Sequence, residues 1–132
     1  NWIDKVKATK RFSAWNVEWK KSVTVQITTL DLLIKQYGQP GYVKIYVEGF
    51  ETEVLKGLTK PVDTVSFEYT LPEMKKEAIE CIDYLASIGS YKFKSQLLSD
   101  HSYVTRNEIV TEINTMCDSG TLHNGDIFAV IR

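Results

Sequence analysis

The chain has 132 residues, of which 43% are hydrophobic and 25% are charged, and its formal net charge is −1. These values are ordinary for a globular domain with its own core, and they argue against a nucleic-acid-binding protein with a broad basic surface. No run of about 18 apolar residues exists, so we expect no membrane-spanning helix. Two cysteines, Cys81 and Cys117, lie far apart without metal-type spacing, which fits a reducing, cytoplasmic compartment.

The first 22 residues form a basic segment that holds all three tryptophans, Trp2, Trp15 and Trp19. This segment is too aromatic for a disordered tail, and we expect it to pack against another part of the protein. Residues 23–29, VTVQITT, alternate in character and are rich in β-branched side chains. This pattern predicts a strand.

A short helix is expected next. Thr28 is followed three residues later by Asp31, a spacing that resembles a capping box. Gly38 and Pro40 then follow in the order that is typical of a helix end.

Two buried strands are predicted at residues 41–47 (GYVKIYV) and 63–69 (DTVSFEY), with a helix at residues 50–58 between them. A connection of this length that contains a helix can cross over the sheet. It therefore favours a parallel pair of strands with a right-handed connection.

The strongest helix pattern covers residues 70–89. Thr70 and Glu73 have capping-box spacing, and Pro72 lies in the expected first turn. The apolar residues of this segment repeat at helical spacing: Met74, Ala78, Cys81, Ile82, Leu85 and Ala86.

The rest of the chain predicts a strand at residues 91–97, a weaker helix around residues 107–116 and a final strand at residues 126–132. His101 and His123 lie in polar, loop-like stretches without an obvious nucleophile or ligand partner. We expect both histidines at the surface.

The alternation of strands and helices indicates an α/β fold. We expect a partial doubly wound, Rossmann-like sheet that is mostly parallel, with an antiparallel C-terminal strand. The strand at residues 41–47 should be central, yet the chain offers few partners for its far edge. Residues 23–27 or a second copy of the chain could cover that edge, and we favour self-association.

Carboxylates gather where the two parallel strands end. If the strands are adjacent, Glu48 and Glu68 fall at neighbouring carboxyl ends, which is where ligands bind in open α/β sheets. Gly49 would let the backbone approach a ligand closely, and Glu51 follows in the first turn of the next helix. The sequence therefore predicts a cleft lined by carboxylates.

These residues also have structural interpretations. Glu48 could cap the helix that follows it, Glu68 could pair with Lys44, and Gly49 could serve only the turn. Tyr46 could be a packed ring with its hydroxyl in water. Paired carboxylates would also suit glycoside hydrolysis, in which their spacing sets the outcome.

The stretch TTLDLLIKQYGQPGYVKIYVEGFETEVLKGL resembles the signature of FkbM-type S-adenosylmethionine-dependent methyltransferases, roughly T-L-D-x-L, a short helix, and K-I-D-V-E-G-x-E-x-x-V-L-x-G. VSFEY, LASIGSYKF and NGDIFAVIR resemble later segments of the family, so the similarity covers roughly residues 23–132. The matching signature residues are Thr29, Leu30, Asp31, Leu33, Lys44, Ile45, Val47, Glu48, Gly49, Glu51, Val54, Leu55 and Gly57.

Two departures from the family pattern bear on activity. Tyr46 stands where the signature has an aspartate, so this position carries no negative charge at neutral pH. Such a charge is worth about 4 kcal/mol to a partner about 4 Å away at an effective dielectric constant of about 20. The chain also lacks the glycine-rich cofactor loop that the resemblance places in the N-terminal half of these enzymes. We therefore expect residues 1–132 to be the C-terminal part of a methyltransferase-like α/β domain.

The resemblance implies a parent enzyme that uses S-adenosylmethionine, a transferase that O-methylates a small-molecule or sugar hydroxyl. It implies catalytic roles for Tyr46, Glu48 and Glu68 and contact with the cofactor for Glu48, Gly49 and Glu51, and we assign no residue to a metal. The missing N-terminal half of the domain would then cover the open edge if a homodimer does not. We expect the chain alone to be inactive and to bind S-adenosylmethionine weakly or not at all. The alternative is a degenerate, non-catalytic binding or interaction module.

Overall fold

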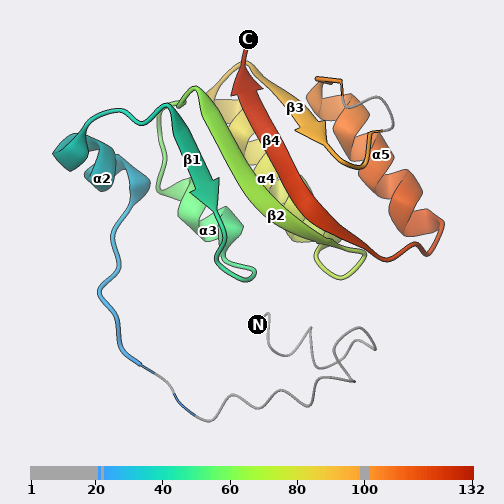
Figure 1. Cartoon of the computed structure of the whole chain (residues 1–132), viewed down its shortest axis with the longest axis horizontal. Helices are drawn as coiled ribbons and strands as arrows, with labels where there is room; N and C mark the ends of the chain where they lie inside the picture. Colours follow the sequence, from blue (N-terminus) through green and yellow to red (C-terminus); the bar gives the residue numbers. More distant parts are fainter. Residues whose placement is uncertain (1–20, 22, 99–101) are drawn as a thin grey trace.

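The computed structural model of the chain describes residue 21 and residues 23–98 and 102–132 (Figure 1). The tryptophan-rich segment and its predicted packing lie outside these residues, as does His101. Helices and strands alternate in the order α2 (Leu30–Tyr37), β1 (Tyr42–Ile45), α3 (Glu51–Lys56), β2 (Thr64–Leu71), α4 (Lys75–Ile88), β3 (Tyr91–Ser95), α5 (Arg106–Asp118) and β4 (His123–Ile131).

Four strands form one mixed sheet in the order β1-β2-β4-β3. β1 and β2 are parallel, with Ile45 level with Phe67, and β4 runs antiparallel to both of its neighbours. The parallel pair is confirmed. The expectation of a mostly parallel, doubly wound sheet is wrong for the described residues, which form one parallel pair and two antiparallel pairs. Periodicity identifies a strand, but it carries no information about which strand lies beside it.

β1 lies at an edge of the sheet and not in its centre, where the sequence predicts it. It is also shorter than predicted, because regular pairing with β2 stops at Ile45 and leaves Tyr46 and Val47 outside the strand. β2 continues beyond this point to Leu71, paired only with β4. The end of β2 is therefore open on the β1 side.

The hydrophobic core lies between the sheet and helices α3, α4 and α5, which pack on one of its faces (Figure 1). Alternate residues of β2 point into this core, and Val65, Phe67, Tyr69 and Leu71 are all nearly fully buried. Burying a large apolar side chain stabilises the fold by about 1.5–3 kcal/mol. The helices contribute the matching apolar residues Leu55, Ala78, Cys81, Ile82, Leu85, Ile109 and Ile113.

The opposite face of the sheet is polar, and no helix of the described chain packs on it (Figure 1). Lys44 forms an ion pair with Asp126 across this face, at 3.0 Å between Nζ and Oδ2. The hydroxyl groups of Tyr42 and Ser66 lie 2.7 Å apart. Lys44 and Ser66 share this face and alternate with the core-facing residues of the same strands.

Both predicted capping boxes are wrong. The N-cap of α2 is Thr29, whose hydroxyl accepts from Leu32 N at 3.3 Å, and Asp31 turns away from the cap. The Asp31 carboxylate accepts from the amide and the hydroxyl of Thr59, at 3.0 and 2.6 Å. Thr70 remains in β2, so α4 begins later than predicted and its N-cap, Met74, makes no side-chain capping bond. In the first case the contact with Thr59, and in the second the pairing of Thr70 in β2, outweighs a capping interaction of about 1 kcal/mol.

Residues 23–29 form no strand, although their pattern predicts one. Val23, Val25 and Ile27 are exposed by 84, 70 and 93%. A β-branched, alternating segment becomes a strand only beside a partner, and the described chain supplies none at this place.

Candidate functional site

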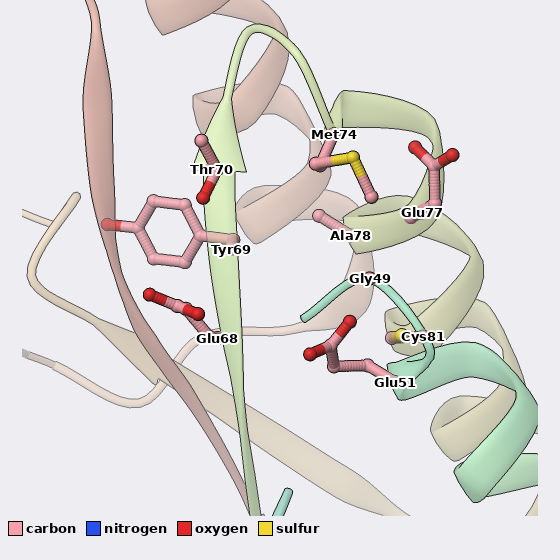
Figure 2. A pocket seen from close by; sticks show the side chains of 9 residues that line it. All are labelled: Gly49, Glu51, Glu68, Tyr69, Thr70, Met74, Glu77, Ala78 and Cys81. Atoms are coloured by element: carbon pink, nitrogen blue, oxygen red, sulfur yellow. The ribbon is translucent and has the colours of Figure 1, made fainter. Parts of the chain in front are cut away.

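A pocket opens where β1 stops and β2 continues. Its wall consists of the end of β2, one face of α4 and the turn that leads into α3 (Figure 2). The free volume at its centre is about 20 Å³, room for a water molecule or two. The lining residues are Gly49, Glu51, Glu68, Tyr69, Thr70, Met74, Glu77, Ala78 and Cys81.

The turn between β1 and α3 contains two consecutive residues in the left-handed region, Glu48 with φ 52° and Gly49 with φ 93°. The left-handed conformation is costly for a residue with a Cβ, on the order of 1–2 kcal/mol. Glu48 does not cap α3, because the N-cap is Phe50 and no side chain makes a capping bond there. The structural interpretation of Glu48 as a helix cap is therefore wrong, and its carboxylate is left at the carboxyl edge of the sheet.

Glu51 holds this turn in place from inside. Its side chain is only 6% exposed, and its Oε1 accepts a hydrogen bond from Val47 N at 3.1 Å. Phe50 N donates to Val47 O at 3.3 Å and closes the turn. Glu51 thus lines the pocket, but its observed contact supports the backbone on which Glu48 and Gly49 lie.

Glu68 is the half-buried carboxylate of the site. Burial raises the pKa of Glu68, and the charges of Glu48, Glu51 and Asp126 raise it further, in that order. The sequence expectation that Glu48 and Glu68 meet at neighbouring strand ends agrees with this coupling. The predicted ion pair of Glu68 with Lys44 does not form, because Lys44 pairs with Asp126.

Tyr46 lies at the rim of this carboxylate cluster and is 56% exposed. The pKa of its phenol is raised, first by the charge of Glu68 and then by that of Glu48. The Lys44 ammonium group lies 5.9 Å from the centroid of its ring. The structure therefore brings Tyr46, Glu48 and Glu68 into one electrostatic cluster, with an uncharged phenol at position 46.

Tyr69 and His123 form a pair that the sequence analysis did not find. The ring of Tyr69 lines the pocket, and its hydroxyl points toward β4 (Figure 2), where it lies 2.8 Å from His123 Nδ1. Gly125 lies opposite Tyr69 in the sheet, and a Cβ there would come within 3.0 Å of the Tyr69 hydroxyl. His123 is partly buried in β4, so its expected surface position is wrong.

Asp126 is also missing from the sequence prediction. It stands level with Glu68 in the β2–β4 pairing, which places it in the carboxylate cluster. Only the antiparallel register of β4 could have revealed it, and the sequence gives no direct sign of that register.

Cys81 lies at the inner end of the pocket as a core thiol. Burial raises its pKa to about 12, and Thr52 Oγ1 lies 3.3 Å from its sulfur. A thiol with such a pKa is protonated at neutral pH and is a poor nucleophile. Among the residues that the structure describes, no group of three or more His, Cys, Asp or Glu side chains could hold a metal ion.

Comparison with known proteins assigns the family. The model of the methyltransferase FkbM domain matches residues 3–116. No curated protein and no solved structure gives a significant match. None of the helices in the described part of the chain is long and apolar enough to cross a membrane. The match includes the β1–α3 turn and most of the elements around it, and the chain belongs to the FkbM methyltransferase domain family.

Proposed function

We propose that the chain contributes the carboxylate-bearing part of a site that uses S-adenosylmethionine to methylate a hydroxyl group of a small molecule or a sugar. The observation that carries the proposal is the cluster of Tyr46, Glu48 and Glu68 beside Gly49, at the carboxyl ends of the parallel pair. Ligands of open α/β sheets bind at this edge. Family membership supplies the class of reaction.

The chemistry of the cluster fits the cofactor that the family implies. S-adenosylmethionine supplies a methyl group from a positively charged sulfur. The carboxylates that raise the pKa of Glu68 would lower the energy of a cation beside them, for the same Coulombic reason. The pocket has room only for water, so Glu48 and Gly49 on the turn would contact the cofactor and Glu51 would hold the turn from behind.

The residues around the cluster suit distinct tasks. Glu68, with its raised pKa, would accept the proton that a hydroxyl substrate loses when its oxygen is methylated. Tyr46 is exposed and neutral, so it would donate a hydrogen bond to the substrate or stack against a sugar ring. The negative charge of Glu48 would attract the positively charged sulfur of the cofactor.

One observation favours the second candidate, a non-catalytic module of the same family. Tyr46 places a neutral phenol where the family signature has an aspartate, and the carboxylate cluster loses one negative charge. On this basis we expect the isolated chain to bind S-adenosylmethionine weakly and to transfer no methyl group.

Titration calorimetry with S-adenosylmethionine on three forms of the chain tests the proposal. Tyr46→Asp should bind the cofactor at least roughly tenfold more tightly than the wild-type chain, because it adds a negative charge to the cluster. Tyr46→Phe is the matched control, since it removes the hydroxyl without adding charge and should bind as the wild type does.

Equal binding by Tyr46→Asp and Tyr46→Phe would show that a cation does not bind at this cluster. Low-micromolar binding by the wild-type chain would show that the cofactor site lies elsewhere. Transfer of labelled methyl groups to sugar and polyol acceptors then separates the candidates: an active wild-type chain excludes the non-catalytic module.

A further inference from the structure

A chain of hydrogen bonds connects three strands beside the pocket. It begins at the amide of Leu97, which donates to Ser95 Oγ at 3.3 Å. The side chain of Ser95 hydrogen-bonds to the Tyr69 hydroxyl, which in turn lies 2.8 Å from His123 Nδ1. Ser95 and Tyr69 are each only 2% exposed, so water competes little for these bonds. The three side chains, Ser95, Tyr69 and His123, are called the relay here.

The donors and acceptors of the relay follow one direction. Ser95 Oγ accepts from a backbone amide, which can only donate, so the single hydroxyl proton of Ser95 is available for Tyr69. Burial raises the pKa of Tyr69, and the hydrogen bond of Ser95 opposes this rise, as a donor to the phenol oxygen does. Tyr69 therefore accepts from Ser95 and uses its own proton for His123 Nδ1.

This direction determines which nitrogen of His123 carries the proton. A neutral imidazole has one donor and one acceptor nitrogen, and Nδ1 is the acceptor here. The proton is then on Nε2, which makes no hydrogen bond with any residue that the structure describes. The rings of His123 and Tyr69 are stacked, with 9° between their planes, so the orientation of the imidazole is held as well. His123 is partly exposed and presents an unused donor.

The unused donor belongs to the same edge of the sheet as the carboxylate cluster. His123 stands level with Leu71 at the carboxyl end of β2, and Asp126 stands level with Glu68. At about 3.3 Å per strand residue, the backbones of His123 and Asp126 are about 10 Å apart. Tyr69 lines the same pocket as Glu68 (Figure 2), and the charge of Asp126 raises its pKa further. A ligand with several oxygen atoms would span this edge.

We propose that Ser95 and Tyr69 are positioning residues that hold His123 as a hydrogen-bond donor, and that His123 Nε2–H binds an oxygen atom of a sugar or another polyhydroxylated substrate. The identity of the ligand rests on the proposed function, in which a hydroxyl group is methylated. The fixed tautomer rests only on the contacts within the relay. Glu68 keeps its role as proton acceptor, and His123 binds a second oxygen atom of the same molecule.

Nitrogen NMR of the histidine rings tests the relay without cofactor or activity. The chain has two histidines, so His101→Gln leaves the signals of His123 alone. At about pH 8, above the ordinary pKa of a histidine, Nε2 should carry the proton and Nδ1 should appear as a hydrogen-bonded acceptor. Tyr69→Phe removes the donor to Nδ1, and Ser95→Ala lets the Tyr69 hydroxyl either donate or accept. Each variant should therefore give averaged signals of both tautomers.

Tyr42→Phe is the matched control, because it removes a hydroxyl that contacts Ser66 outside the relay. It should leave the signals of His123 unchanged. A proton on Nδ1 in the wild-type chain would overturn the relay whether or not the variants fold. Spectra of Tyr69→Phe and Ser95→Ala that match the wild type would overturn it too.

Titration with glucose tests the binding role. The Nε2 signal of His123 should shift with glucose concentration until it saturates. His123→Gln keeps an N–H donor of similar reach and should bind glucose nearly as the wild type does, whereas His123→Leu should bind roughly tenfold more weakly, as followed by the backbone amides of β4. A fixed tautomer whose Nε2 signal ignores glucose would overturn the binding role. A response to glucose in a chain that fails to bind S-adenosylmethionine would contradict the proposed cofactor site and support this inference.

Discussion

The acidic residues at the end of the parallel pair act on the ionisation of Glu68. The pKa of Glu68 is raised by Glu48, Glu51 and Asp126 as well as by burial, and Lys44 provides a smaller opposing effect. An aspartate at position 46 would add another negative charge to this group. Tyr46 keeps the position neutral and so limits the repulsion among the neighbouring carboxylates.

Outside the carboxylate cluster, the site depends on the absence of a side chain at Gly125. A Cβ at this position would lie 3.0 Å from the Tyr69 hydroxyl and 2.9 Å from Gln96 Oε1. Gly125→Ala should therefore displace the Tyr69 ring, break its bond to His123 and destabilise the fold by about 1–3 kcal/mol. Urea unfolding measures this as a lower midpoint with an unchanged slope.

Gly41→Ala is the matched control for this prediction. A Cβ on Gly41 has no neighbour within 4 Å, and the backbone of Gly41 is not left-handed. Its stability should stay within about 0.5 kcal/mol of the wild type. If both glycine variants unfold at the wild-type midpoint, Tyr69 has room to move and its contact with His123 is not a structural requirement.

At the scale of elements, α2 is held by polar contacts as well as by Leu30 and Ile34, which are partly buried against the core. None of its residues is buried, and its first turn is joined to the chain after α3 through Asp31 and Thr59. Hydrogen bonds from Thr59 lower the pKa of Asp31. The contact between Asp31 and Thr59 therefore stabilises the attachment of α2 fully at pH values above the ordinary pKa of an aspartate. This contribution is lost as the pH falls through the lowered pKa of Asp31.

Asp31→Ala should release α2 and leave the sheet folded. The amides of α2 should lose protection from hydrogen exchange by roughly tenfold or more, whereas those of β2 and β4 should keep theirs. The wild-type chain should show the same selective loss as the pH falls below the ordinary pKa of an aspartate and through the lowered pKa of Asp31. Asp118→Ala is the control, because Asp118 is exposed at the end of α5. Equal loss of protection in α2 and β2 would mean that α2 unfolds only with the whole domain.

The elements also show which parts of the structure the sequence can predict. The apolar periodicity of α4 and the pattern of β2 depend on burial along one face, and both elements form, although α4 begins later than its pattern predicts. The partner order of the strands depends on contacts far apart in the chain, and so do the positions of Asp126 and His123. Residues 23–29 carry a strand pattern that is the same with or without a partner, so the pattern alone could not show that they pair with no strand of the described chain.

At the scale of the whole molecule, the described sheet is covered by helices on one face only (Figure 1). Adjacent residues of β4 therefore lie in different surroundings. Ile127 is fully buried beneath the helices, and Phe128 is partly exposed on the polar face beside Ser66 and Lys94. The stability of the chain should depend on the first face much more than on the second.

A pair of substitutions measures this asymmetry. Ile127→Ala should lower the free energy of unfolding by about 2–5 kcal/mol, because it leaves a cavity in the packed core. Phe128→Ala removes a larger side chain but should cost less, about 1–2 kcal/mol, since that ring is only partly buried and no described helix packs over it. Urea unfolding of the two variants at one protein concentration gives both values. If Phe128→Ala costs as much as Ile127→Ala, a second layer covers the polar face in solution, and the carboxylate cluster of Glu48 and Glu68 then lies between two layers instead of at an open surface.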